Sequence, residues 1–461
     1  MFYKVNESYR LVGWRNLPTG VLDVQKDSVS FLPRDEYGLL LHMNGQEEID
    51  VRKLTAKQQE VIQRFLDDKM IDAADHPFTE TPKPLYRFRD HARIDSVQWS
   101  ITGKCNFNCR HCLMSAPQNC SADLTTGQCL DIVRQLAECG VRSIAITGGE
   151  PLIRSDLPDL IKACSDAGIR IAEVYTNGAL LSPQMLDQFT RMGQRPGIQI
   201  SYDGIGWHDW VRGIDGAQQI AEKAIRTAHE AGLRVSAAMA LFKDNVPVIR
   251  ETIRRLASMS VGRVKISPMM ELGLWGENHA DKTLSDEEFL QAILGYIPYF
   301  IEDGKPCWLT MGGYLFYDRD TDLFSSTEAK NPDSPTPLYP CQGVVLNPYI
   351  SAEGTILPCM SFADDPAYQD YPNLLETPLI QILQDSIWLK TSRTTIQDVF
   401  EHNAECMQCE ERGKHCALSC RSCAKPGFCD IDRTTCAFVK NGWFRKVQEA
   451  VETAGGKYVL Y

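Results

Sequence analysis

The sequence lacks the features that would place it in several large classes of protein. No stretch approaches the ~20 consecutive apolar residues that a membrane-spanning helix requires, so we expect no membrane partner. Positive charge is also scarce, because 60 acidic side chains outnumber 48 lysines and arginines and give a net charge of −12. Binding of nucleic acid depends on clustered positive charge. We therefore expect no nucleic acid partner either.

The residues Met1–Glu7 lack the layout of a secretory signal peptide. In a secreted protein, the 17 cysteines of this chain would suggest disulfides. Without such a signal, the better interpretation is a cytoplasmic protein whose reduced cysteines bind metal. None of the cysteines lies in residues 1–85, so cysteine-bound metals are expected only beyond this segment.

At 461 residues the chain is too long for one ordinary core, and two or three domains are expected. From about residue 96 to residue 300, strand-like runs alternate with helix-like segments such as Thr125–Cys139, which begins with a capping box of Thr125 and Gln128. Six such repeats predict an α/β fold, an open parallel (β/α)6 barrel with its site at the C-terminal ends of the strands. The predicted strands are Val97–Ile101, Ser143–Thr147, Arg170–Tyr175, Gly197–Ser201, Val235–Leu241 and Val264–Ser267.

Three cysteines follow the first predicted strand at C-x3-C-x2-C spacing: Cys105, Cys109 and Cys112. Three thiolates can hold three irons of a four-iron cubane and leave the fourth iron open, whereas such clusters normally have four cysteine ligands. A zinc site or chance spacing is the alternative. Structural zinc sites prefer four ligands in paired C-x2-C elements, and no such partner pair lies nearby.

The other predicted strand ends carry residues suited to binding a small ligand. Gly148 and Gly149 follow the second strand, where bare backbone lets a ligand approach, and the Glu150 carboxylate could bind an ammonium group. Asn177 follows the third strand. Ser201 ends the fourth strand and is followed by Arg212, and an arginine can bind a carboxylate through two hydrogen bonds.

The triplet and the Gly-Gly-Glu sequence together resemble the radical S-adenosylmethionine (SAM) superfamily. The resemblance implies that the open iron chelates the amino and carboxylate groups of SAM and reduces its sulfonium. The family usually has an aromatic residue where this chain has His111. The segment from Ser201 to Gly213 resembles the SxDG…HDxxRG pattern of radical SAM peptide-modifying enzymes, which implies that Ser201 and Arg212 contact SAM.

A second group of cysteines begins at Cys341 and resembles a SPASM domain. Nine cysteines within 96 residues imply metals that hold this region together, with zinc as an alternative for Cys406 and Cys409. The resemblance implies two auxiliary [4Fe-4S] clusters, although six residues rather than five separate Cys409 from Cys416. The distal cluster would use Cys406, Cys409, Cys416 and, as the best choice of fourth ligand, Cys436. The proximal cluster would use Cys341, Cys359 and Cys420, and Cys423, Cys429, Cys307 or a substrate thiolate could complete it.

Residues 1–85 contain three predicted strands (Tyr9–Val12, Gly20–Val24 and Ser28–Leu32), a further element at Tyr37–Met43 and a helix at Thr55–Lys69 with one apolar face. This segment is either a structural cap on the barrel or a winged-helix-like peptide-recognition element. It resembles the PqqD-like element of ribosomal peptide modification systems, which binds a leader peptide as an added strand. The proline-rich residues 77–84 are expected to form a linker.

The resemblances imply four regions: a recognition domain (1–85), a radical SAM barrel (90–310), a SPASM domain (335–440) and a C-terminal helix or tail (441–461). They imply an enzyme that takes hydrogen from a ribosomally made precursor peptide with a 5′-deoxyadenosyl radical. A thioether crosslink is the first expectation, followed by a carbon–carbon or carbon–oxygen bond. A flavodoxin or ferredoxin would supply single electrons.

Three other functions remain open at this point. A sulfatase-maturing-type oxidase or a small-molecule radical SAM enzyme would share the barrel. An electron carrier or a zinc-scaffolded binding protein would be non-catalytic. No residue beyond the cluster is assigned as a catalytic acid or base.

Overall fold

The chain forms two compact units in a computed structural model. One is Met1–Arg93 with Ile380–Asp385, and the other is Ile94–Leu379 with Ser386–Tyr461. The structure describes residues 1–15, 17–26, 28–79, 86–112, 123–271, 273–326, 339, 341–363, 367–401, 404–410 and 441–459.

The larger unit is built on a 12-stranded sheet with the order β18-β17-β8-β9-β10-β11-β12-β13-β14-β15-β16-β19. All six predicted strands are present, and each pairs in parallel with the next. A seventh parallel strand, β14 (Trp308–Met311), follows them. The prediction of an α/β fold with a large parallel sheet is therefore confirmed. The six strands are β8 (Ser96–Ser100), β9 (Ser143–Thr147), β10 (Arg170–Thr176), β11 (Gly197–Ser201), β12 (Val235–Leu241) and β13 (Arg263–Pro268).

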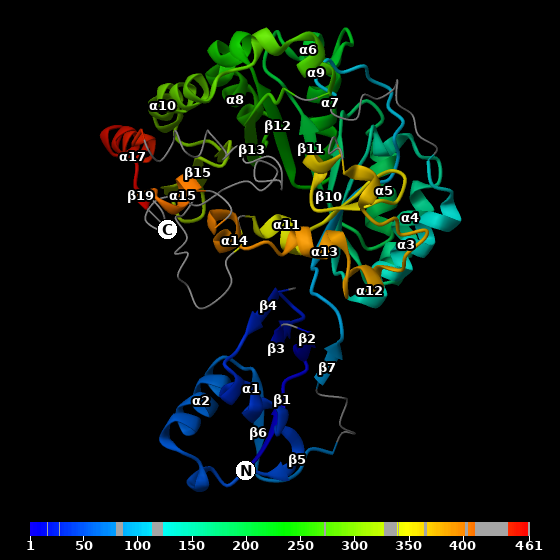
Figure 1. The fold of residues 1–461 in the computed structure, drawn as a ribbon, viewed down its shortest axis with the longest axis vertical. Coiled ribbons are helices and arrows are strands. Elements are labelled where there is room, and N and C mark those ends of the chain that lie inside the picture. Colours follow the sequence, from blue (N-terminus) through cyan, green and yellow to red (C-terminus); the bar gives the residue numbers. More distant parts are fainter. Residues whose placement is uncertain are drawn as a thin grey trace. The chain divides into compact units, whose positions relative to one another are not determined.

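The connecting helices lie around the outside of these strands (Figure 1). The first of them shows why the sequence folds this way. Thr125 and Gln128 form the predicted capping box, and Gly140 ends the helix in a left-handed conformation (φ 82°). Its apolar face, which includes Ile132 and Leu136, is fully buried. The helices are α3 (Thr126–Cys139), α4 (Leu157–Asp166), α5 (Pro183–Arg191), α7 (Ala217–Glu230), α8 (Ile249–Ser258) and α10 (Asp286–Glu302).

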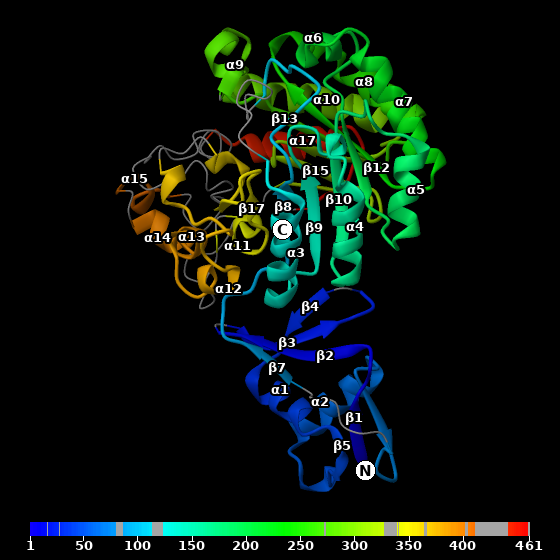
Figure 2. The ribbon, with the colours of Figure 1, turned by 90° about the vertical axis from the view of Figure 1, so that its right-hand side faces the viewer.

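Shorter strands extend the sheet at both ends. On one side β15 (Leu315–Asp318) and β16 (Leu323–Ser325) continue it antiparallel, and β19 (Tyr458–Val459) pairs with β16. On the other side β17 (Tyr349–Ile350) pairs in parallel with β8, and β18 (Ile356–Leu357) follows it (Figure 2). The start of the cysteine-rich region thus belongs to the same unit as the parallel strands.

The remainder of the cysteine-rich region is described only in part. Short helices α11 (Gln342–Leu346), α12 (Leu379–Ile382), α13 (Ile387–Ser392), α14 (Ile396–Glu401) and α15 (Ala404–Met407) follow Cys341, and α17 (Trp443–Thr453) lies near the C-terminus. Five predicted ligands lie outside the described residues, namely Cys416, Cys420, Cys423, Cys429 and Cys436.

Among its described residues up to Arg93, the smaller unit contains two sheets and two α-helices. A three-stranded antiparallel sheet has the order β5-β1-β6, and a four-stranded sheet has the order β4-β3-β2-β7. The three predicted strands are confirmed as β2 (Tyr9–Trp14), β3 (Leu17–Asp23) and β4 (Ser28–Phe31). The predicted helix is α2 (Ala56–Asp67). The element expected at Tyr37–Met43 lies mostly in helix α1 (Arg34–Leu41). The sequence interpretation missed β1 (Phe2–Val5), β5 (Asn44–Glu48), β6 (Ile71–Ala74) and β7 (Tyr86–Arg89).

This unit extends beyond the predicted boundary at residue 85, because β7 pairs in parallel with β2. The apolar face of α2 packs into its core through Val61, Ile62 and Phe65. Part of the predicted linker, residues 80–84, lies outside the described residues.

Among the described helices, none combines the length and the apolar character needed to cross a bilayer.

Candidate active site

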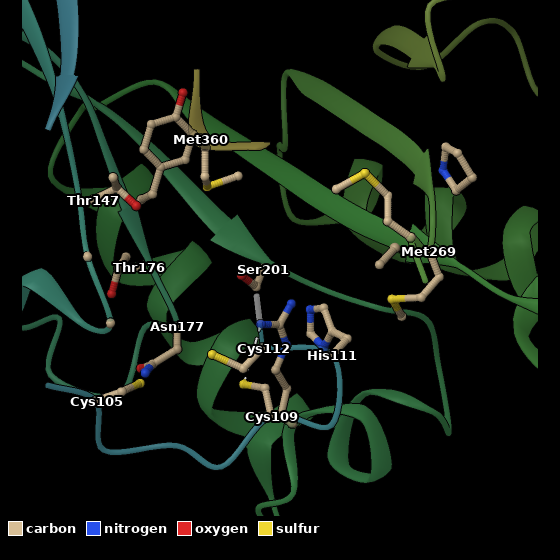
Figure 3. A pocket seen from close by; sticks show the side chains of 17 residues that line it. Cys105, Cys109, His111, Cys112, Thr147, Thr176, Asn177, Ser201, Met269 and Met360 are labelled. Atoms are coloured by element: carbon tan, nitrogen blue, oxygen red, sulfur yellow. Dashed lines mark hydrogen bonds between the residues drawn. The ribbon is translucent and has the colours of Figure 1, made fainter. Parts of the chain in front are cut away.

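The site is a cavity of about 350 Å³ at the C-terminal ends of the parallel strands (Figure 3). The last residues of four strands line it: Thr147 of β9, Thr176 of β10, Ser201 of β11 and Pro268 of β13. This is the end of the sheet at which the sequence interpretation expects the site. Parallel sheets commonly bind ligands there, because the loops that follow the strands converge.

Most of the residues predicted to hold the first cluster and to bind SAM meet in this one cavity. The structure brings together the three cysteines of the triplet, both glycines, the asparagine, the serine and the arginine. These lining residues are Cys105, Cys109, Cys112, Gly148, Gly149, Asn177, Ser201 and Arg212. Glu150 is the exception, because it is not among the lining residues.

Backbone hydrogen bonds attach the start of the cysteine loop to the Gly-Gly-Glu sequence. The Gly149 N–H donates to the Thr102 carbonyl, and the Glu150 N–H donates to the Lys104 carbonyl, both at 2.8 Å. A Cβ atom on Gly149 would lie only 2.2 Å from the Lys104 carbonyl oxygen. The glycine is therefore required by the close approach of the chain's own loop, a reason that the sequence interpretation missed.

The end of the same loop rests on α6 (His208–Arg212). The Arg110 N–H donates to the Val211 carbonyl at 2.9 Å, and the Arg110 guanidinium lies 4.8 Å from the centre of the Trp210 ring. Gly213 has φ 65°, and a Cβ atom there would lie 2.4 Å from the Asn108 carbonyl oxygen. Both halves of the cysteine loop are thus held by backbone contacts with other elements.

Glu150 is fully buried and bonds to the chain itself. Its carboxylate accepts hydrogen bonds from the Thr176 hydroxyl (2.8 Å), the Asn177 N–H (2.8 Å) and the Leu152 N–H (3.1 Å). Burial raises the pKa of Glu150 to about 7, because these three neutral donors offset only part of its desolvation. The geometry shows a carboxylate that joins the ends of β9 and β10, and binding of an ammonium group by Glu150 stays a prediction.

Asn177 connects the third strand end to the cysteine loop. Its side-chain amide donates to Asn106 at 2.8 Å, and its carbonyl oxygen accepts from the Ala179 N–H at 2.9 Å. Asn106 lies directly after Cys105 and was missed by the sequence interpretation. Its position between two cysteines of the triplet was the available signal.

Arg212 lies between a buried carboxylate and a cysteine. Its Nε donates to Asp203 at 2.7 Å, and its Nη1 lies 3.7 Å from the Cys109 sulfur. Burial alone would raise the pKa of Asp203, but the Arg212 charge and the contact with His208 hold it well below its usual range. A guanidinium has five N–H donors, so Arg212 retains donors for a ligand carboxylate.

The three cysteines of the loop are half-buried and free of disulfides. Burial raises the pKa of Cys105 to about 11 and also raises that of Cys109. Bound metal would therefore have to displace their protons. Within the described part of the chain, no three Cys, His, Asp or Glu side chains gather as ligands of one metal ion.

The cavity also has an apolar wall that the sequence interpretation did not include. It consists of Ala240, Pro268, Met269, Met270 and Met360, and Figure 3 shows Met269 and Met360 away from the cysteines. Met270 and Met360 are 47% and 36% exposed. Met360 directly follows the predicted ligand Cys359, so the cysteine-rich region contributes to the cavity.

The predicted auxiliary ligands are only partly described. Cys341, Cys359 and Cys409 are half-buried, and Cys406 lies in α15. The described residues contain no three-residue metal site here either, so the auxiliary clusters stay a prediction. Cys307, a candidate fourth ligand, is fully buried in the core of the sheet.

Residues 99–256 match the sequence model of the radical SAM superfamily. This range runs from β8 into α8 and contains the cysteine loop, the Gly-Gly-Glu sequence and Arg212. This part of the chain is therefore similar to a radical SAM domain.

Two curated relatives and one solved structure describe the similarity further. Fe-coproporphyrin III synthase of Methanosarcina barkeri is 30% identical over 199 residues, which cover 43% of this chain and 49% of the relative. The chain thus spans about half the length of that protein. PqqA peptide cyclase of Granulibacter bethesdensis is 26% identical over 363 residues, or 77% of this chain and 90% of the relative.

The solved structure is Streptococcus suis SuiB bound to precursor peptide SuiA. It has a TM-score of 0.63 and 15% identity, and the match covers 91% of this chain and 96% of SuiB. At this level of identity the comparison shows a shared fold.

Proposed function

We propose that this chain is a radical SAM enzyme, which cleaves SAM reductively and uses the resulting radical to modify a ribosomally made precursor peptide. The single observation that carries the proposal is the cavity itself, in which three thiols of one loop lie beside glycine backbone, Asn177, Ser201 and Arg212. These are the residue types that a cluster and the amino-acid part of SAM require.

The residues fit named roles around the two cofactors. Cys105, Cys109 and Cys112 would hold a [4Fe-4S] cluster, whose chemistry when bound is the one-electron cleavage of SAM. Arg212 and Ser201 would hold the SAM carboxylate, since a guanidinium and a hydroxyl both donate to carboxylate oxygens. The backbone at Gly148–Gly149 would position the ammonium end. Of these lining residues, Arg212 is already oriented by an ion pair.

The apolar wall has the second task in the proposal. Ala240, Pro268 and the three methionines limit water near the reacting carbon. Methionine side chains are flexible and polarisable, and they can pack against different substrate side chains. The wall would therefore hold the target residue of the peptide in contact with the radical.

A peptide substrate is supported by the extent of the similarity. PqqA peptide cyclase carries a peptide in its name, and the SuiB structure contains a precursor peptide. Both matches extend well beyond residues 99–256. The N-terminal unit contains the small antiparallel sheet β5-β1-β6, and a leader peptide would bind as an added strand at its edge.

The proposal also includes the features that follow from the SPASM resemblance. Two auxiliary clusters would accept the electron that remains after hydrogen abstraction, or bind a substrate thiolate. The product would contain a thioether or, as the next choice, a carbon–carbon or carbon–oxygen crosslink. The enzyme would work in the cytoplasm with flavodoxin or ferredoxin as electron donor.

The test has two steps. The reconstituted full chain is incubated without oxygen with dithionite and SAM, and 5′-deoxyadenosine is measured by chromatography. It is then co-expressed with short peptides encoded next to its gene, and the peptides are analysed for a loss of two hydrogens by mass spectrometry. Absence of deoxyadenosine would reject SAM cleavage, whereas deoxyadenosine without any modified peptide would reject the peptide substrate.

A second candidate is a small-molecule radical SAM enzyme, favoured by the 30% identity with Fe-coproporphyrin III synthase. That match covers less than half of this chain. Turnover of a tetrapyrrole in the absence of peptide would support this candidate. A sulfatase-maturing-type oxidase would act on a polypeptide whose leader had been removed, and the same assay with leaderless peptides would identify it.

A further inference from the structure

Asp203, Arg212 and Cys109 form a continuous line of charged and polar contacts. Arg212 bonds to Asp203 through Nε at 2.7 Å and approaches the Cys109 sulfur through Nη1 at 3.7 Å. Asp203 is fully buried, and the Arg212 side chain is 11% exposed. A buried guanidinium has few alternative positions, so the carboxylate decides where it lies.

Asp203 is itself held by several elements. Its second oxygen accepts from the Ala240 N–H of β12 at 3.1 Å, and its carbonyl accepts from the Asn245 amide at 2.8 Å. Its N–H donates to Nδ1 of His208 at 2.9 Å. These contacts hold the carboxylate and the backbone of Asp203 from β12, from the segment that follows it and from α6.

We propose that Asp203 is a positioning residue that fixes Arg212 against Cys109, and that this pair sets the reduction potential of the cluster. The inference rests on the proposed function, because it assigns Cys109 as a cluster ligand. It adds a role for Asp203, and a second role for Arg212 besides the proposed contact with SAM.

The physical basis is the charge change on reduction. The reduced cluster carries one more negative charge, so an N–H donor and a positive charge near a ligand sulfur favour reduction and raise the potential. The Asp203 carboxylate opposes this effect, since it adds a negative charge next to the guanidinium. The two residues therefore act on the potential with opposite signs.

Two substitutions separate the opposite effects of Asp203 and Arg212 on the reduction potential. Asp203→Asn keeps an oxygen that can accept from Arg212 but removes the negative charge, so the midpoint potential should rise. Arg212→Lys keeps the ion pair but loses the planar fork that reaches both Asp203 and Cys109, so the potential should fall. A residue that only supports the fold would not shift the potential in opposite directions under these two changes.

Glu222 provides the matched control. It is a buried carboxylate that pairs with Arg255 and accepts from the Tyr202 hydroxyl, one residue before Asp203. Neither Glu222 nor Arg255 lines the cavity. Glu222→Gln removes a buried charge from the same region without touching a cysteine, and the potential should stay at the native value.

The experiment is a redox titration of the reconstituted full chain without oxygen, followed by electron paramagnetic resonance, for the native protein and the three variants. Iron content and circular dichroism are measured on each sample. To isolate this cluster, each titration is repeated with Cys105, Cys109 and Cys112 replaced by alanine, which identifies the signal that the triplet produces.

The outcomes separate the inference from the proposed function. If the native protein gives no signal that depends on the triplet, the cluster assignment is wrong. If that signal is present but Asp203→Asn and Arg212→Lys leave its potential unchanged, the inference is wrong. If Asp203→Asn fails to fold, Arg212→Lys decides alone, and a lowered potential with native iron content supports the inference.

Discussion

Two buried carboxylates near the cavity, Glu150 after β9 and Asp203 after β11, have opposite electrostatic environments. Both side chains are fully buried, and both accept backbone N–H groups from neighbouring segments. The other donor to Glu150 is a neutral hydroxyl, and the pKa of this residue rises to about 7. Asp203 also receives a guanidinium, and its pKa falls well below the usual range.

The difference shows how neutral hydrogen-bond donors and a cation each change the pKa of a carboxyl group at a similar degree of burial. Removing a carboxylate from water disfavours its charged form, and neutral hydrogen bonds offset only part of that cost. A cation in direct contact favours the charged form more strongly than burial disfavours it, so the pKa falls. The β9 region therefore has a carboxylate that titrates near neutral pH, and the β11 region has a permanently charged ion pair beside Cys109.

The largest loss of activity should follow from replacing the cysteines of the triplet. The comparison of the two carboxylates assumes that they support a cluster site, and these cysteines would hold the cluster. Replacing Cys105, Cys109 and Cys112 together by alanine should abolish deoxyadenosine formation and remove the iron of this site. Cys129→Ala is the control, since this fully buried cysteine of α3 does not line the cavity. Cleavage of SAM by the triple variant would contradict the assignment.

The two carboxylates should next differ in how much stability their loss costs. Asp203→Ala leaves the Arg212 charge buried without its partner, which should lower the free energy of unfolding by about 3–5 kcal/mol. Glu150→Ala leaves neutral donors without an acceptor, which should cost about 1–3 kcal/mol. Chemical denaturation of both variants and the native chain measures the difference. Equal losses would show that the Arg212 pair adds nothing beyond hydrogen bonds.

The pH dependence of stability should separate the carboxylates without changing the fold. Between pH 4.5 and about 7 the unfolded chain has lost the Glu150 proton while the folded chain retains it. Unfolding then releases a proton, so stability should fall by roughly 3 kcal/mol as pH rises through this window. Asp203 stays ionised in the folded chain throughout and contributes no such slope.

Denaturation curves across this pH range check the prediction against Glu150→Gln, which has no proton to lose. The native chain should show the steeper decline between pH 4.5 and 7. Parallel curves for the two proteins would mean that Glu150 is ionised in the folded chain at pH 5.

The smallest loss of stability should follow from removing one neutral hydrogen-bond donor to Glu150. Thr176→Val deletes the hydroxyl that donates to Glu150 and accepts from the Gly178 N–H. The expected loss of unfolding free energy is about 1 kcal/mol. Thr176→Ser keeps the hydroxyl and should retain most of the native stability. A loss as large as that of Asp203→Ala would contradict this prediction, because the hydroxyl would then stabilise the fold as much as a buried ion pair does.

Sequence patterns predicted the parallel strands and the cavity side of the sheet. Strands buried on both faces appear as short β-branched runs between turn residues, and Ser143–Thr147 and Gly197–Ser201 were located with their correct bounds. The cysteine spacing and the glycine pair were visible for the same reason, since both are local. Because they follow neighbouring parallel strands, their approach to one another could also be inferred.

Long-range contacts were not predictable in this way. No local pattern shows that Asn177 reaches Asn106, or that Met360 lines the cavity from a region predicted to be separate. Whether Glu150 faces the cavity or the chain depends on the packing of Thr176 and Leu152 around it. The short strands β1 and β6 are four residues each, too brief for a periodic signal.

The backbone contacts of the cysteine loop have a consequence for how the enzyme survives exposure to air. Backbone groups of Thr102, Lys104 and Arg110 bind the loop to the Gly-Gly-Glu sequence and to α6, and these hydrogen bonds do not involve the cysteine sulfurs. When oxygen destroys a cluster there, the thiol-bearing scaffold should persist, so supply of iron, sulfide and reductant would be enough for repair.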